Sequence, residues 1–275
     1  MFFTRLMSSV ILLALTIAAN LLGGPLLAVQ LFIISMIGLF EFNRAVGVRT
    51  KEKRCNSLEA VAYLGTIALY ITAFFATSNT ERYMLLVLAA VFVLLMAVYV
   101  FAFPKYEASQ IMNAFFGFLY VPVMLSFIYL TRCLTYGEYT IWLIFIGSWM
   151  CDTCAYCTGM LLGKHRLAPV LSPKKSIEGS VGGIVGAAIV AALFAYFIVE
   201  AATPNQAVTW VFVVIGAVGA MVSQVGDLAA SAIKRNHNLK DYGKLIPGHG
   251  GILDRYDSVI FTAPMIYFLV VIFVH

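Results

Sequence analysis

Apolar runs long enough to cross a lipid bilayer recur nine times along this 275-residue chain. Each crossing needs about 20 residues, because a helix must span a hydrocarbon layer about 30 Å thick. Composition agrees, since 62% of the residues are hydrophobic and only 11% are charged, a balance too apolar for one soluble globular domain. The sequence therefore predicts an all-α integral membrane protein with about nine transmembrane helices.

The first predicted span also fits a cleaved signal peptide, because Arg5 precedes an apolar stretch that ends in small residues. We keep that alternative open. The nine spans lie roughly at Leu6–Leu22, Pro25–Phe42, Leu58–Thr77, Tyr83–Phe103, Ile111–Leu130, Tyr139–Leu162, Ser180–Val199, Val208–Ile233 and Ser258–Val274.

Basic residues predict the orientation of these spans, because cytoplasmic loops carry the excess of Lys and Arg. With nine spans, sixteen of the 18 basic residues fall on one side, and only Arg82 and Arg132 fall on the other. The N-terminus is therefore expected in the cytoplasm and the C-terminus outside. The net charge of +5 reflects this topology, and no nucleic-acid partner is expected.

Polar residues concentrate in two cytoplasmic segments, 151–180 and 223–258, and nothing comparable precedes Gln110. Three cysteines of the first segment, spaced i, i+3 and i+6, lack a nearby fourth ligand and are expected to pack rather than bind a metal. Five glycines recur at a spacing that lets helices approach closely, and packing is their expected role: Gly159, Gly163, Gly179, Gly183 and Gly186.

In the second segment, Asp227, Ser231 and Lys234 are spaced i, i+4 and i+7, so they share one helix face. An acid within a span costs roughly 2.5 to 3.5 kcal/mol on insertion scales, so it usually pairs with a base, binds an ion or serves a function. Asp227 is therefore expected to have a partner, which can be a basic neighbour in a purely structural ion pair.

The chain then turns through Pro247–Gly251, where glycines let backbone N–H groups approach an anion. Asp254 and Asp257 follow at i, i+3 near the start of the last helix, where acids are also common caps. Acids, bases, a hydroxyl and a glycine turn within about thirty residues favour a polyphosphate with Mg²⁺, which prefers carboxylate and phosphate oxygens. The candidate ligands are Asp227, Asp254 and Asp257.

The first segment adds a short basic loop with hydroxyl groups that can hold phosphate oxygens, formed by Ser172, Lys174, Lys175 and Ser176 ahead of Glu178.

Read in order, the second segment contains a serine, a Lys-Arg pair, a Lys-Asp pair, PGHGG, LDR and a final Asp, at Ser231, Lys234, Arg235, Lys240, Asp241, Pro247, Gly248, His249, Gly250, Gly251, Asp254, Arg255 and Asp257. The first segment contributes Asp152, Thr153, Ala155, Tyr156, Ser172, Pro173, Lys174, Lys175, Glu178 and Gly179. Both segments resemble the motifs of the phosphatidate cytidylyltransferase family, the CDP-diglyceride synthetases. Three positions depart from the family pattern: Cys154 replaces a glycine, Ser176 replaces a threonine, and Tyr256 replaces a smaller apolar residue.

The resemblance, which covers the second half of the chain, implies magnesium-dependent transfer of a cytidylyl group from CTP to phosphatidic acid in the membrane. It implies catalytic roles for Ser231, Lys234, Arg235, His249 and Arg255. It also makes Asp152 and Asp241 weaker candidates for holding Mg²⁺, either as ligands or next to the ligands. It implies substrate binding by Ser172, Lys174, Lys175, Ser176, Lys240, Gly248, Gly250 and Gly251. Residues 106–275 would then be the catalytic region, facing the cytoplasm, and residues 1–105 would form about four N-terminal transmembrane helices. The number of Mg²⁺ ions, an additional monovalent cation and a homodimer stay open.

Two alternatives remain. The same motifs would suit a cytidylyltransferase for another lipid phosphate, such as an archaeal ether lipid. Charged residues within spans are also found in transporters, although these groups crowd one membrane surface and no internal repeat is evident.

Overall fold

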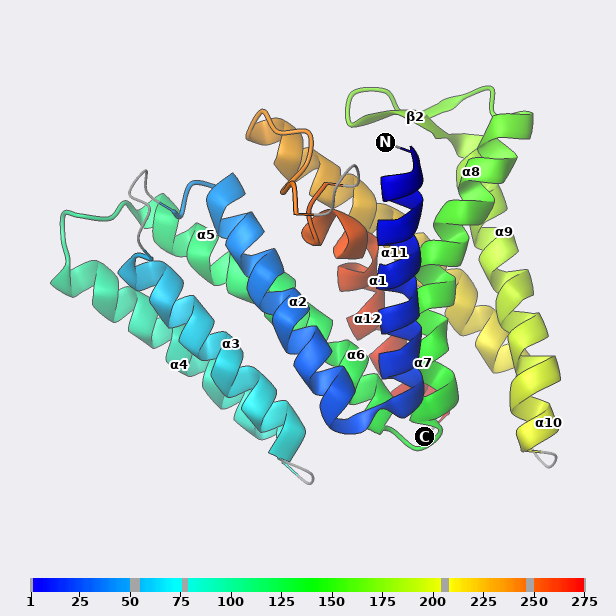
Figure 1. Ribbon diagram of the computed structural model, residues 1–275, viewed down its shortest axis with the longest axis horizontal. Coiled ribbons are helices and arrows are strands. Elements are labelled where there is room, and N and C mark those ends of the chain that lie inside the picture. The colour runs from blue at the N-terminus through cyan, green and yellow to red at the C-terminus, as the bar shows by residue number, and fades with distance from the viewer. Residues whose placement is uncertain (1, 50–54, 76–78, 204–207, 246–249, 275) are drawn as a thin grey trace. The chain divides into compact units, whose positions relative to one another are not determined.

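The computed structural model describes residues 2–49, 55–75, 79–203, 208–245 and 250–274. Within these residues the chain is almost entirely helical, with nine helical segments of membrane length in succession (Figure 1). They are α1 (Phe2–Leu22), α2 (Gly24–Ala45), α3 (Ser57–Phe75), α4 (Thr80–Phe101), α5–η1–α6 (Ala108–Phe118, Leu119–Val123, Met124–Cys133), α7–η2–α8 (Gly137–Phe145, Ile146–Met150, Cys151–Leu162), α9–η3–α10 (Ile177–Phe194, Ala195–Val199, Glu200–Ala202), α11 (Thr209–Asn236) and α12 (Leu253–Phe273).

The prediction of an all-α membrane protein is confirmed. Among the described residues, eight of the segments are long and apolar enough to cross a membrane, and the ninth, α1, is apolar along Val10–Leu22. Each predicted span coincides with one segment to within a few residues at either end. The chain is therefore a multi-pass membrane protein, while its orientation stays a prediction.

Three of the segments contain a π-helical turn, at η1, η2 and η3. The η1 turn includes Pro122, which has no N–H to donate to the helix. A wider turn at this point lets the helix continue across the proline. The η2 turn directly precedes α8, the helix that carries Asp152.

Packing divides the chain into two compact units. Unit 1 contains Met1–Tyr129 and His237–Arg255, and unit 2 contains Leu130–Asn236 and Tyr256–His275. Helix α12 therefore begins in unit 1 and continues in unit 2. The division at residue 105 that the sequence suggested concerns function rather than packing, and it stays a prediction.

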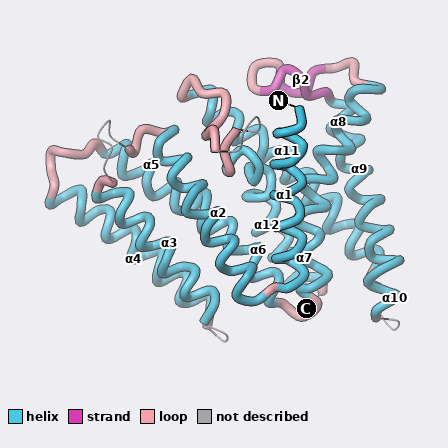
Figure 2. Tube along the Cα trace, viewed as in Figure 1, coloured by secondary structure: helices cyan, strands magenta, loops and turns pink. Residues whose placement is uncertain are grey.

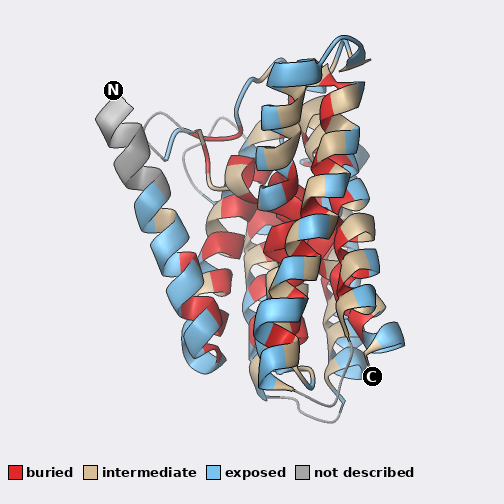
Figure 3. Ribbon diagram, turned by 90° about the vertical axis from the view of Figure 1, so that its right-hand side faces the viewer, coloured by how far each residue is buried: buried red, intermediate tan, exposed pale blue. Residues whose placement is uncertain are grey.

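In unit 1, α3 and α4 run side by side, and α2 packs against α3 and against the α5–η1 segment (Figure 1). The interior is filled by aliphatic and aromatic side chains, including Leu39, Phe42, Leu58, Leu95 and Phe118. By contrast, most described side chains of α1 are exposed (Figure 3). These side chains are mainly apolar, so the exposed face of α1 suits contact with lipid tails.

In unit 2, α8 and α9 pack side by side through small residues (Figure 1). A Cβ atom on Gly183 would lie 2.9 Å from the backbone oxygen of Cys151, and one on Gly186 would overlap the side chain of Cys154. Only glycine allows the two helices to approach this closely, so the packing role predicted for these glycines is confirmed. All five cysteines lie among the described residues and none of them forms a disulfide bond; Cys151 is buried.

The segment between α8 and α9 forms an antiparallel hairpin that the sequence did not predict. Strand β1 (Arg166–Ala168) pairs with β2 (Ser172–Ser176), with Arg166 opposite Ser176. Figure 2 shows the two strands at one end of α8 and α9. The predicted basic loop is therefore an ordered strand whose alternate side chains point in opposite directions.

Candidate functional site

The hairpin of unit 2 brings Lys175 to helix α11. Lys174 is exposed, whereas Lys175 is half-buried, as expected for neighbours on a strand. The Lys175 Nζ atom forms an ion pair with the Asp227 Oδ2 atom. Asp227 thus has the basic partner that an acid within a span requires.

A second ion pair joins α11 to α12 within unit 2. The Nζ atom of Lys234 lies 3.9 Å from the Oδ2 atom of Asp257, and the two side chains are only 10% and 12% exposed. Asp257 also accepts a hydrogen bond from the backbone N–H of Ser258 at 2.8 Å. Asp227 and Asp152 both interact electrostatically with Asp257, so two further predicted acids lie within range of its charge.

These residues fit Mg²⁺ in one respect. Mg²⁺ is commonly held by one or two carboxylates together with substrate phosphates, and Asp227 and Asp257 supply two carboxylates near two lysines. Within either unit, the described residues contain no group of three His, Cys, Asp or Glu side chains arranged for a metal. Binding here would therefore depend on phosphate oxygens from a substrate, and the metal assignment stays a prediction.

Glu178, at the start of α9, fixes the base of the hairpin. Its Oε2 atom accepts hydrogen bonds from the backbone N–H groups of Lys164 at 3.1 Å and His165 at 3.2 Å. Its Oε1 atom lies 2.6 Å from the Nδ1 atom of His165. Glu178 thereby holds the residues that lead into β1, the strand that pairs with the strand of Lys175.

The other predicted residues of unit 2 lie on α8, on β2 and on α11. Ser176 is buried and caps α9, where its Oγ atom accepts a hydrogen bond from the backbone N–H of Gly179 at 3.1 Å. The remaining ones are half-buried or exposed: Asp152, Ser172, Lys174, Ser231 and Arg235. Their proposed contacts with substrate stay predictions.

In unit 1, Asp254 closes the loop that precedes α12. Its Oδ2 atom accepts hydrogen bonds from the backbone N–H groups of Tyr242 at 2.8 Å and Gly251 at 3.0 Å. Gly250 has a φ angle of +85°, in the left-handed region that favours glycine. Asp254 therefore joins two parts of the loop before α12, and its role as a metal ligand stays a prediction.

Glu41, on α2, holds the same loop from outside. Its Oε1 and Oε2 atoms accept hydrogen bonds from the backbone N–H groups of Ile252 at 3.2 Å and Leu253 at 2.9 Å. Further along α2, the Nη2 atom of Arg44 donates to the backbone oxygen of Tyr242 at 2.7 Å. Neither side chain was singled out from the sequence. An acid inside the second predicted span was the signal that could have identified Glu41.

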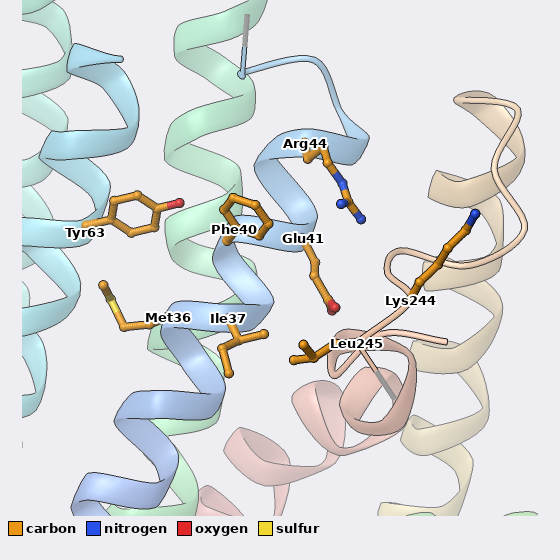
Figure 4. Close-up of a pocket in the computed structure, with 8 residues that line it drawn as sticks. All are labelled: Met36, Ile37, Phe40, Glu41, Arg44, Tyr63, Lys244 and Leu245. Atoms are coloured by element: carbon orange, nitrogen blue, oxygen red, sulfur yellow. The ribbon is translucent and has the colours of Figure 1, made fainter. Parts of the chain in front are cut away.

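A pocket of about 670 Å³ opens beside these contacts in unit 1 (Figure 4). In this view Arg44, Glu41 and Lys244 lie toward one side, and Met36 and Tyr63 lie toward the other. The pocket therefore combines an apolar lining with two basic groups and the acid Glu41. Its lining residues are Met36, Ile37, Phe40, Glu41, Arg44, Tyr63, Lys244 and Leu245.

Part of the predicted glycine turn, Pro247, Gly248 and His249, lies outside the described residues. The remaining predicted residues of unit 1 are exposed or half-buried in the loop and at the start of α12, and their roles stay predictions: Lys240, Asp241, Gly250 and Arg255.

Curated relatives match about half of the chain. The phosphatidate cytidylyltransferase of Staphylococcus saprophyticus is 36% identical over 149 residues, which are 54% of this chain and 55% of the relative. Proteins of the same name from Staphylococcus aureus and Staphylococcus haemolyticus are 37% and 35% identical over 152 residues, 55% of this chain and 56% of each relative. The chain thus spans about half the length of the curated relatives it matches.

A family model covers much more of the sequence. The model described as the cytidylyltransferase family matches residues 3–273, which include both ion pairs of unit 2, the loop held by Glu41 and Asp254, and all nine helical segments. By this match the chain belongs to the cytidylyltransferase family.

Proposed function

We propose that this protein is a phosphatidate cytidylyltransferase. An oxygen of the phosphatidic acid phosphate attacks the α-phosphorus of CTP, and a new P–O bond forms as the bond to the β-phosphate oxygen breaks. The products are CDP-diacylglycerol and pyrophosphate. The observation that carries the proposal is the family match over residues 3–273 of a chain that crosses the membrane many times, where a lipid acceptor is directly accessible.

The chemistry needs charge neutralisation more than a strong base, because the lipid phosphate is already anionic near neutral pH. Lys175 and Lys234 are suited to bind the phosphates of CTP while leaving Asp227 and Asp257 for a metal ion. Mg²⁺, when bound, would neutralise charge that develops on the leaving pyrophosphate. The lysines and acids would then hold two anions in line for transfer.

The unit 1 pocket supports a lipid acceptor. Met36, Ile37, Phe40 and Leu245 offer apolar surface for an acyl chain, and a basic pocket between helices suits an anionic headgroup. We propose that Arg44 and Lys244 attract the lipid phosphate there. On the predicted orientation, the site opens to the cytoplasm, the compartment that contains CTP.

The test is transfer of radiolabel from [α-³²P]CTP into chloroform-soluble product by purified protein in mixed micelles with phosphatidic acid and Mg²⁺. Asp257→Asn is assayed beside Glu138→Gln, a matched acid-to-amide change at an exposed residue of α7. We expect product from the parent and from Glu138→Gln, with at least a hundredfold loss in Asp257→Asn.

Product with an ether-linked lipid phosphate but not with phosphatidic acid would overturn the assigned acceptor. Full activity in Asp257→Asn would remove Asp257 from the proposed site. Absence of product from folded parent protein with either lipid would refute the function.

A further inference from the structure

Glu41 is a buried acid in unit 1, about one turn before the C-terminal end of α2. Its side chain is 3% exposed, although a carboxylate inside a span is costly. Both of its oxygens accept backbone N–H groups at the start of α12, from Ile252 and Leu253. The first N–H groups of a helix have no partner within that helix and favour a negative charge. Glu41 therefore caps α12 from a helix more than 200 positions away in the sequence.

Two glycines of the loop are packed against the same carboxylate. A Cβ atom on Gly243 or on Gly251 would overlap the carboxylate of Glu41. Only the backbone of the loop can approach Glu41 this closely. The carboxylate thus lies in a cradle formed by two glycines and two N–H groups.

Helix α2 holds the loop at a second point. Arg44, nearly one turn beyond Glu41, donates to the backbone oxygen of Tyr242, and the Tyr242 ring lies 6.3 Å from the ring of Phe42. Asp254 binds the N–H of the same tyrosine. Helix α2 consequently holds the described residues of this loop on both sides, 242–245 and 250–253.

We propose that Glu41, which also lines the unit 1 pocket, is a positioning residue for the transfer reaction and acts through this loop. The inference rests on the proposed function, in which Asp254 and Asp257 belong to the site. In the sequence, the loop includes the glycine turn and is followed directly by α12, the helix of these two acids. Loss of the cap lets the loop shift, and misplacement of catalytic groups by about 1 Å can cost a hundredfold in rate.

The experiment compares Glu41→Gln and Glu41→Ala with Glu59→Gln in the full-length protein. Glu59 is an apt control because it is fully buried and caps its own helix, α3, by accepting the N–H of Asn56 at 3.2 Å. We expect kcat/KM for CTP to fall about tenfold in Glu41→Gln and about a hundredfold in Glu41→Ala. Glu59→Gln should retain the kcat/KM of the parent, even if its thermal stability falls as far as that of the Glu41 variants.

Amide hydrogen exchange tests the mechanism without relying on activity. In the Glu41 variants, exchange at Ile252 and Leu253 should accelerate at least tenfold, whereas Glu59→Gln should leave it unchanged. Unchanged exchange in Glu41→Gln overturns the inference, as does an equal loss of activity in Glu59→Gln. If the parent transfers no cytidylyl group to phosphatidic acid, the proposed function fails while the exchange result still decides the role of Glu41.

Gly251→Ala supplies a second test that keeps the carboxylate. Its methyl group should displace Glu41 and reproduce both the kinetic loss and the faster exchange. In a Glu41→Ala background the same change should cost little more, because the overlap is gone. Additive losses in the double variant would contradict the cradle.

Discussion

Replacing Lys234 with methionine should test whether the second ion pair is a buried, coupled pair. Lys234→Met keeps the length of the side chain and removes its charge, which leaves Asp257 without this partner. Two unit charges 3.9 Å apart attract by about 4 kcal/mol at an effective dielectric constant of about 20. Removing one member of a buried pair costs about 3 to 5 kcal/mol. We expect Lys234→Met to lower the free energy of unfolding by about 3 kcal/mol.

The assay is reversible unfolding in mixed detergent micelles, applied to Lys234→Met, Asp257→Asn and the double variant. The double variant leaves no uncompensated charge, so it should be more stable than Lys234→Met, with a coupling energy of about 2 kcal/mol. All three variants should lack transfer activity, because each lacks at least one charge of the pair. The double variant should regain stability without regaining activity. A Lys234→Met protein as stable as the parent, or a double variant as unstable as the sum of its parts, would refute the buried coupling.

Three further results are expected. Lys175→Met should raise the KM for CTP about tenfold while Lys175→Arg stays near the parent value, since a phosphate contact needs the positive charge; equal KM values in steady-state assays would exclude that contact. Gly186→Ala should destabilise the protein by about 1 to 3 kcal/mol because its methyl group overlaps Cys154. Cys154→Gly should recover part of this loss in denaturant unfolding, and a failure to recover would place the strain elsewhere. Chelation of divalent cations should abolish product formation and added Mg²⁺ should restore it, whereas activity that survives EDTA would argue against the metal assignment.

The membrane spans were predictable because the signal is local. Each span needs only an unbroken apolar run of the right length, and the helical segments coincide with the nine predicted runs. The shared face of Asp227, Ser231 and Lys234 follows from the helical period in the same way. Family motifs then identified the chemistry, because they combine acids, bases and glycines at fixed spacing.

Pairings between distant segments were not predictable in this way. Several basic residues could have neutralised Asp227. Lys175 does so because of the hairpin, and no residue pattern in the sequence predicted its strand pairing. Within the second span, Glu41 is a single charge with no motif around it. Its role as a cap exists only because folding brings it to an N–H group 212 positions later in the chain.

The position of each helix, and the residues that share one of its faces, depend on neighbours within one or two helical turns. The sequence shows these neighbours directly. The capping of α12 by Glu41 and the ion pairs of Asp227 and Asp257 depend on which helices pack together. A buried charge requires a partner, so the sequence determined that partners must exist. Only the tertiary structure decided which residues they are.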